Sequence, residues 1–139
     1  ELQNSRRARG VAAWAALQQL GANGVCRLVD GCCTHAARLA LLLQEGGAEL
    51  LHPVVFNQAL IRFGTDARTT AVAAAVQTDG RCWVGSTTYH GMVVIRLSVS
   101  SWMTTADDVG VAARAILECA KQCGHASSVY SEGKTEPNC

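Results

Sequence analysis

The chain has 139 residues, of which 49% are hydrophobic and 17% charged, and its formal net charge is +1. These values describe one domain of an ordinary soluble globular protein, and they give no sign of binding to nucleic acid or another polyanion. No apolar run approaches the length of a membrane span, and the first residues lack the apolar stretch of a signal peptide. The chain starts without methionine, so we expect a processed chain, a fragment or a trimmed form.

The predicted elements begin with two helices. Apolar residues at helical spacing indicate a first helix from about 7 to 21 and a longer one from about 25 to 44. The glycines of Gly21-Ala-Asn-Gly24 interrupt the pattern between them. The apolar stripe of the second helix predicts these core positions: Val25, Leu28, Val29, Cys32, Ala36, Leu39, Ala40 and Leu43.

Strands and helices alternate in the rest of the chain. The patterns predict strands at 48–51 and 54–63, a helix from 65 to 78, an antiparallel hairpin of 81–90 with 92–100, and a last helix that starts near Thr104-Thr105. The core face of this last helix is predicted to consist of Val109, Ala112, Ala113, Ile116, Leu117 and Ala120. The fold class is therefore α+β, a small and mostly antiparallel sheet that is covered by helices and preceded by two helices.

Arg96 is the one charge in a strand of alternating residues. Val93, Ile95, Leu97 and Val99 fall on one face, and Met92, Val94, Arg96, Ser98 and Ser100 fall on the other. An arginine is rarely buried without a partner, and its planar fork suits a carboxylate through two parallel hydrogen bonds. Arg96 is therefore either a carboxylate-binding residue, a side chain on a half-solvated strand face, or the partner of a structural Asp or Glu.

The other chemistry-bearing residues are scattered. The carboxylates Asp30, Glu45, Glu49, Asp66 and Asp79 fall at helix ends, turns or solvent-facing places, which is typical of caps rather than of an acid–base pair. The histidines are His35, His52, His90 and His125, and only His90 is near Arg96 in sequence. The two lysines, Lys121 and Lys134, follow the last core positions, so no lysine is placed to form a Schiff base. These residues predict no catalytic group in the chain.

The seven cysteines are too few for a disulfide scaffold and lack the spacing of a zinc site. Cys119 and Cys123 could share a helix face near His125, but no second cluster completes a tetrahedron. Reduced, partly buried thiols in a cytoplasmic protein are the favoured interpretation, with no metal bound.

Several segments together resemble one enzyme family. They are Ser5–Trp14, Leu20–Gly24, Val54–Phe63, Cys82–Val84 and Val94–Thr105 followed by Asp107–Val109. In this order they resemble the C-terminal part of group II pyridoxal-phosphate-dependent amino-acid decarboxylases, the family of the aromatic-amino-acid and glutamate decarboxylases. The resemblance covers roughly residues 5 to 120.

The resemblance implies a fold, a cofactor and partners. Members are dimers of the aspartate-aminotransferase fold (fold type I), in which a small C-terminal domain closes over the cofactor held by a large domain. Residues 1–22 would be the helix leaving the missing large domain, 23–123 the small domain, and 124–139 a disordered tail. The exposed side of the first helix around Val11, Trp14 and Ala15 would then make the isolated chain prone to association.

The resemblance also assigns one site residue. The arginine of the motif matching Val94-Ile-Arg-Leu-Ser98 is implicated in holding the substrate's α-carboxylate, which carries over to Arg96. Orienting that carboxylate against the cofactor ring favours cleavage of the carbon–carbon bond. The Schiff-base lysine and the residues that hold the cofactor match no position of this chain, so the chain alone is expected to be inactive. The hairpin residues Trp83, Thr87, Thr88 and Tyr89 are expected near the site, without assigned roles.

Three hypotheses follow. The first is a decarboxylase fragment that contributes Arg96 as the carboxylate anchor. The second is a stand-alone α+β module that binds a small carboxylate or a partner protein, and the third is a degenerate fragment that keeps only its core pattern. The substrate's side chain is not predicted by this sequence.

Overall fold

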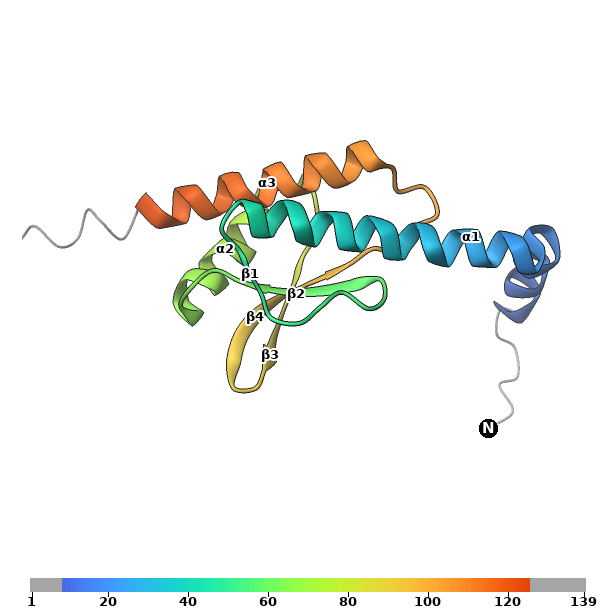
Figure 1. Ribbon diagram of the computed structural model, residues 1–139, viewed down its shortest axis with the longest axis horizontal. Helices are drawn as coiled ribbons and strands as arrows, with labels where there is room; N and C mark the ends of the chain where they lie inside the picture. The colour runs from blue at the N-terminus through green and yellow to red at the C-terminus, as the bar shows by residue number, and fades with distance from the viewer. Residues whose placement is uncertain (1–8, 126–139) are drawn as a thin grey trace, which may run out of the picture.

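In the computed structural model of the chain, residues 9–125 are described, and they form a layer of helices on one face of an antiparallel sheet (Figure 1). The elements in order are α1 (Arg9–Glu45), β1 (Glu49–Leu50), β2 (Gln58–Arg62), α2 (Asp66–Asp79), β3 (Gly85–Tyr89), β4 (Met92–Ser98) and α3 (Ala106–His125). The strands lie in the order β1-β2-β4-β3, and every neighbouring pair is antiparallel. The α+β class predicted from the sequence is confirmed.

The first two predicted helices are two arms of α1. The arms meet at Gly21, whose φ of 60° and ψ of 178° are non-helical and lie in a region that only glycine adopts without strain. The arm before Gly21 turns away from the long arm and projects beyond the sheet (Figure 1). The glycine therefore makes the break that the sequence predicted, although helical residues continue on both sides of it.

All four strands are shorter than predicted, β2 and β3 most of all. β2 begins at Gln58 rather than near Val54, because β1 has only two residues and β4 ends at Ser98, which leaves the preceding segment without a strand partner. Asn57 closes the ladder instead, since its carbonyl accepts from the Val99 amide at 2.9 Å and its Nδ2 donates to the Val99 carbonyl at 2.9 Å. β3 begins at Gly85 rather than at Arg81, whose guanidinium pairs with Asp79 and Glu118.

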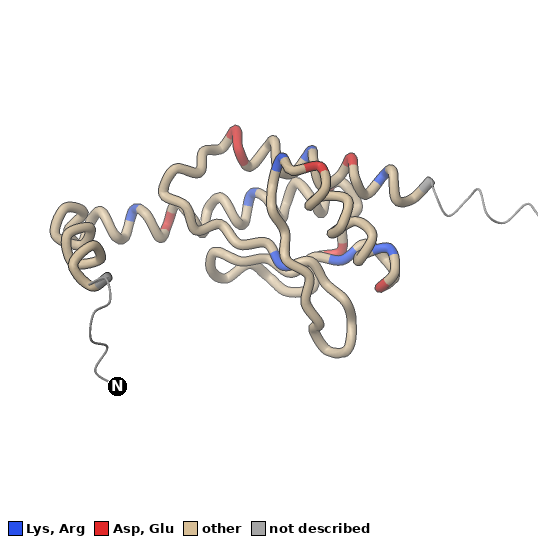
Figure 2. The backbone as a smooth tube through the Cα atoms, turned by 180° about the vertical axis from the view of Figure 1, so that it is seen from behind, with Lys and Arg blue, Asp and Glu red and all other residues tan. Residues whose placement is uncertain are grey.

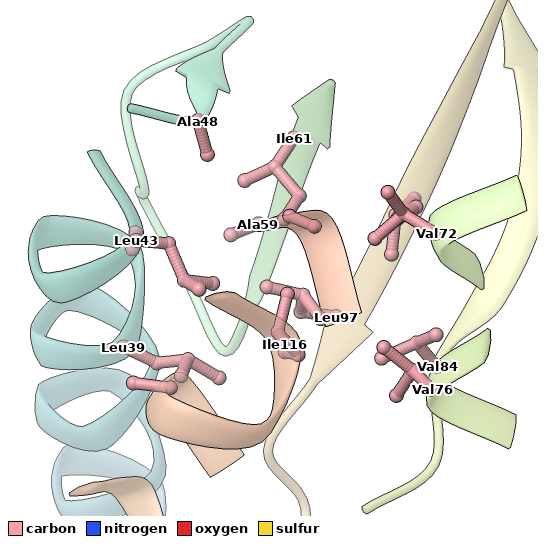
Figure 3. Close-up of a cluster of buried hydrophobic side chains, with 14 of the residues drawn as sticks. Leu39, Leu43, Ala48, Ala59, Ile61, Val72, Val76, Val84, Leu97 and Ile116 are labelled. Carbon is pink, nitrogen blue, oxygen red and sulfur yellow. The ribbon is translucent and has the colours of Figure 1, made fainter. Parts of the chain in front are cut away.

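The core lies between the helices and one face of the sheet (Figure 3). The largest fully buried side chains include members from α1, α2, α3 and the sheet: Leu43, Ile61, Val72, Val76, Val84, Ile95 and Ile116. The apolar stripe predicted for α1 is buried from Cys32 onward, whereas its first part around Val25 is only partly buried. Burying each of these aliphatic side chains stabilises the fold by about 1.5–3 kcal/mol.

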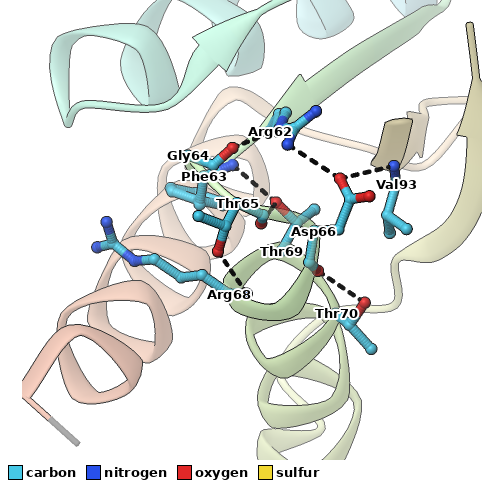
Figure 4. A network of polar contacts seen from close by, with 9 residues as sticks. All are labelled: Arg62, Phe63, Gly64, Thr65, Asp66, Arg68, Thr69, Thr70 and Val93. Atoms are coloured by element: carbon cyan, nitrogen blue, oxygen red, sulfur yellow. Dashed lines mark hydrogen bonds and ion pairs between the residues drawn. The ribbon is translucent and has the colours of Figure 1, made fainter. Parts of the chain in front are cut away.

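The start of α2 is tied to the sheet by polar contacts (Figure 4). Thr65 is the N-cap, and its Oγ1 accepts from the Arg68 amide at 3.2 Å. The Asp66 carboxylate accepts from the Val93 amide of β4 at 3.1 Å and pairs with Arg62 at 2.9 Å. These contacts fix α2 against β2 and β4.

The last helix is longer than its core pattern. α3 includes Gly124 and His125, the first two residues of the tail predicted from the sequence. The rest of that prediction, 126–139, lies outside the described residues, as do residues 1–8. None of the helices within 9–125 is both long enough and apolar enough to span a membrane.

Candidate carboxylate site

The two faces of β4 separate as the alternation predicted from Ile95 onward, whereas Val93, also predicted for the core face, is only half-buried. Ile95, Leu97 and Val99 are buried in the core under the helices, while Arg96 and Ser98 are exposed on the opposite face of the sheet. Val94, on the same face as Arg96, is fully buried, so this face is covered at one end and open at the other. Arg96 lies on the open part.

The strand register surrounds Arg96 with an apolar residue and a glycine. Leu60 of β2 lies directly opposite Arg96 on one side, and Gly85 of β3 lies opposite on the other. A Cβ atom built at Gly85 would come no closer to a neighbour than 3.9 Å, to the Arg96 carbonyl oxygen, so there is room beside the arginine. The Arg96 side chain therefore stands between a hydrocarbon neighbour and open space.

Arg96 lines an open hollow with a volume of about 560 Å³. The sheet and the segment between β1 and β2 form its walls: Gln58, Leu60, Tyr89 and Arg96 come from strands, and His52, Pro53, Val55 and Phe56 from the segment. This volume falls within the range of about 300–1,000 Å³ that is typical of small-molecule sites. The hollow can thus hold a small ligand against the guanidinium.

No described residue neutralises Arg96. Among residues 9–125 its guanidinium makes no hydrogen bond or ion pair, which excludes a structural Asp or Glu of this range as its partner. The sequence left open whether Arg96 is solvated, structurally paired or a binding residue. The first and the last of these agree with an exposed side chain beside a hollow.

Two histidines lie on the segments that carry lining residues of the hollow. His52 places Nδ1 at 2.9 Å from the Pro53 carbonyl oxygen, and because that oxygen can only accept, Nδ1–H is the donor. His90, the histidine nearest in sequence, occupies the β-hairpin turn with a φ of 48°, next to Gly91 with a φ of 78°. Its ring packs edge-on against Tyr89 at 4.3 Å between centroids.

The hollow collects residues that the sequence did not group. Of the hairpin residues expected near the site, Tyr89 lines the hollow, whereas Trp83 lines a separate cavity of about 300 Å³ between β4, α3 and the segment before β3. Thr87 and Thr88 are exposed and line neither cavity. His52 and Phe56 were not anticipated, because only the path of the segment between β1 and β2 brings them beside Arg96.

Asp79 and Glu118, two acidic residues outside the hollow, are structural partners of an arginine. Arg81 holds the pKa of Asp79 below its usual range, chiefly through a hydrogen bond of 2.7 Å from its Nε, and it also pairs with Glu118 at 2.6 Å. The charged residues of 9–125 are spread over the elements rather than gathered in one patch (Figure 2). These groups form no acid–base pair beside Arg96.

The described cysteines differ in burial: Cys32 and Cys119 are buried, Cys33, Cys82 and Cys123 are half-buried, and Cys26 is exposed. The six within the described range form no disulfide. Burial is the first cause that raises the pKa of Cys82 and of Cys119, which keeps these thiols protonated and weakly nucleophilic. Within 9–125, no three His, Cys, Asp or Glu side chains come together as a set of metal ligands.

The described residues do not fit covalent attachment of pyridoxal phosphate. Lys121 is the only lysine within residues 9–125. It belongs to α3, in the helical layer, whereas the Arg96 side chain lies on the other side of the sheet. Its amine therefore cannot reach a group that is bound in the hollow.

Comparison with known proteins defines the fold. No family model matches the sequence, and no curated protein sequence matches it. Solved structures do match: Oryza sativa TDC with PLP and tryptamine has a TM-score of 0.77 at 19% identity, over 87% of this chain and 28% of that one. Catharanthus roseus tryptophan decarboxylase in complex with L-tryptophan has a TM-score of 0.76 at 17% identity, over 85% of this chain and 26% of that one.

A third match comes from a bacterium. It is the glutamate decarboxylase domain of diaminobutyrate-pyruvate transaminase and L-2,4-diaminobutyrate decarboxylase from Vibrio parahaemolyticus, with a TM-score of 0.72 at 17% identity, over 85% of this chain and 27% of that one. The chain thus has the fold of one part of these decarboxylases and spans between 26% and 28% of their length. The fold implied by the sequence motifs is confirmed.

Proposed function

We propose that the chain is the C-terminal part of a pyridoxal-phosphate-dependent amino-acid decarboxylase, a carboxy-lyase, in which Arg96 binds the substrate's carboxylate. The observation that carries this proposal is the unpaired Arg96 guanidinium in an open hollow, on a fold shared with decarboxylases. An arginine fork binds a carboxylate through two charge-assisted hydrogen bonds, which fix the orientation of the carboxylate as well as its position.

In this proposal the chain supplies binding and orientation. Arg96 holds the carboxylate, and the hollow shields that contact on the side of Leu60. The cofactor and its lysine belong to a large domain outside this sequence, since the described residues offer no lysine at the hollow. A second subunit and a cytoplasmic location are part of the same proposal, by analogy with the family that the sequence resembles.

A stand-alone carboxylate-binding or protein-interaction module is the second candidate. It is favoured by the same hollow, which is open in the chain by itself. The reading frame upstream of Glu1 discriminates between the two. A lysine in a strand-loop context there supports the enzyme, whereas a start codon close to Glu1 supports the module.

Two measurements test the decarboxylase proposal. Mixed with pyridoxal phosphate, the chain alone should develop no stoichiometric aldimine absorbance. A stable band would contradict the proposal that the cofactor's lysine lies outside this sequence. In the complete reading frame, Arg96→Ala should lower kcat/KM for release of CO₂ at least about thirtyfold, because losing one partner of a charged pair costs about 2–5 kcal/mol. Cofactor absorbance should be unchanged.

Arg114→Ala is the matched control, since Arg114 is an exposed arginine of α3 in the helical layer. Its activity should equal that of the unmodified enzyme. An Arg96→Ala enzyme with full activity would show that Arg96 is merely a solvated side chain of the sheet.

A further inference from the structure

The hollow beside Arg96 has one charged residue in an otherwise uncharged or titratable, mainly apolar lining. Arg96 is the one permanently charged residue of its lining, and no carboxylate contributes to the lining. The remaining side chains are mainly hydrocarbon and aromatic: Pro53, Val55, Phe56, Leu60 and Tyr89, with Gln58 and His52 as the other polar members. One end of a ligand would therefore meet a cation, and the rest would meet apolar surface.

Phe56 and Tyr89 come from different parts of the chain and both line the hollow. Phe56 lies on the segment between β1 and β2 and is 55% exposed, so much of its ring surface is available to a ligand. Tyr89 lies at the end of β3, where its edge-on contact with the His90 ring restrains the direction of its own ring. Aromatic rings in such positions favour a flat, uncharged group in offset or edge-on packing, by about 0.5–1.5 kcal/mol for each pair.

A charge on the ligand's side chain would lack a partner in the lining. A side-chain ammonium would find no carboxylate in the lining, because Asp66, an acid near β4, is engaged by Arg62 and the Val93 amide. A second carboxylate would find no second permanent cation. Leaving a charge unpaired against apolar surface is unfavourable.

We propose that this hollow is a specificity site, which selects carboxylates whose side chain is a flat, uncharged group and discriminates against those whose side chain is charged. Phe56 is the specificity-determining residue and Arg96 the anchor. The inference rests on the proposed role of Arg96 as carboxylate anchor. It adds that residues of this chain contact the side chain of the ligand and select among side chains.

Binding of three simple probes to the full chain tests the proposal without any cofactor or turnover. The probes are 3-phenylpropionate, adipate and 6-aminohexanoate, titrated at pH 8 while the NMR signals of the Arg96 Nε–H and the Tyr89 amide are followed. 3-Phenylpropionate should bind at least about tenfold more tightly than either of the others, as expected for two ring contacts and no unpaired charge. No binding of 3-phenylpropionate up to about 20 mM would overturn the proposal.

Variants separate the anchor from the selectivity. Arg96→Gln should weaken binding of all three probes, and Phe56→Ala should reduce the preference for 3-phenylpropionate by about the worth of one ring contact while leaving adipate binding unchanged. Trp83→Ala is the matched control, an exposed aromatic residue at the other cavity, and it should change nothing. Equal affinities for the three probes, or a preference that Phe56→Ala leaves undiminished, would overturn the specificity site but leave the decarboxylase proposal intact. Conversely, selective binding in a complete protein that releases no CO₂ from amino acids would end the decarboxylase proposal and keep the specificity site.

Discussion

Among residues 9–125, Thr69 is the only polar residue that is buried, and 0% of its surface is exposed. Its hydroxyl donates to the Thr65 carbonyl at 2.9 Å and accepts from the Phe63 amide at 3.1 Å (Figure 4). The second contact gives the Phe63 amide an acceptor. This amide lies just after the end of β2, where it has no partner in the sheet. One hydroxyl thereby joins the first turn of α2 to the sheet that carries the candidate site.

Replacing Thr69 should therefore be costly although the size change is small. Thr69→Val leaves the Phe63 amide without an acceptor, and we expect the free energy of unfolding to fall by about 1–3 kcal/mol. Urea unfolding followed by circular dichroism measures this change.

Thr70→Val is the matched control for that substitution. Thr70 makes the same type of contact, from Oγ1 to the Asp66 carbonyl at 2.9 Å, but it is exposed and accepts from no backbone amide. It should change the free energy of unfolding by no more than about 0.5 kcal/mol. Equal losses in the two variants would show that the contact with Phe63 contributes nothing.

At the scale of the elements, α3 owes its starting point to a reciprocal cap. The Asp108 carboxylate accepts from the Thr105 amide at 2.8 Å and from the Thr105 hydroxyl at 2.7 Å, while that hydroxyl accepts from the Asp108 amide at 3.2 Å. Both hydrogen bonds from Thr105, the side-chain one first, hold the pKa of Asp108 below its usual range. The pattern of threonines followed by acids predicted this helix start from the sequence.

The cap should make stability depend on pH in a defined direction. A carboxyl whose pKa is lower in the folded state than in the unfolded chain stabilises the fold above the unfolded pKa, which is about 4, and loses that contribution as pH falls through the folded pKa. The difference in free energy of unfolding between the unmodified chain and Asp108→Asn should thus be greatest above about pH 5 and shrink below about pH 4. Urea midpoints measured from pH 7 down to pH 3 check this.

Asp107→Asn controls for a general effect of acids in the first turn. Asp107 is also exposed in that turn, but it makes no hydrogen bond with a described residue. The change with pH in its free energy of unfolding, relative to the unmodified chain, should be smaller than that of Asp108→Asn. A difference for Asp108→Asn that stays constant over the whole range would contradict the role of its carboxylate.

At the scale of the whole molecule, the first arm of α1 stands apart from the core. Every residue from Gly10 to Asn23 is exposed, and this stretch carries no charge. Val11 and Trp14 are each 63% exposed, followed by Leu17 and Leu20 one and two turns further along. An isolated helix of this length is marginal in water, so a helix of this composition is expected to pack against another surface.

The isolated chain should therefore associate through this arm. Sedimentation should show an average mass that rises with concentration, and the helical circular dichroism signal should rise with it. The double substitution Trp14→Lys and Leu17→Lys should abolish both trends, because it places two charges on the exposed apolar side.

Trp102→Lys is the matched control, since Trp102 is an exposed tryptophan outside the arm. It should leave the association unchanged. A chain that remains monomeric at all concentrations would show that the arm needs no partner.

The sequence predicted the elements better than their ends. Periodicity placed every helix and paired the hairpin strands, because these signals are local. The ends of β2 and β3 depend on where a neighbouring strand stops, as at Asn57 and Gly85, and that information is long-range. The candidate carboxylate site shows the same division. Arg96 was identified from the alternation of one strand, whereas Phe56 and His52 were not.

The sequence by itself determined that Arg96 would lie on the face of β4 opposite to the core, since side chains alternate along any strand. Only the tertiary structure decided what surrounds it. The register that sets Leu60 and Gly85 beside Arg96, and the path that carries Phe56 over the sheet, follow from pairing between distant segments, which no local pattern encodes. A charged residue and its face are local properties, whereas a binding site is a property of the packed chain.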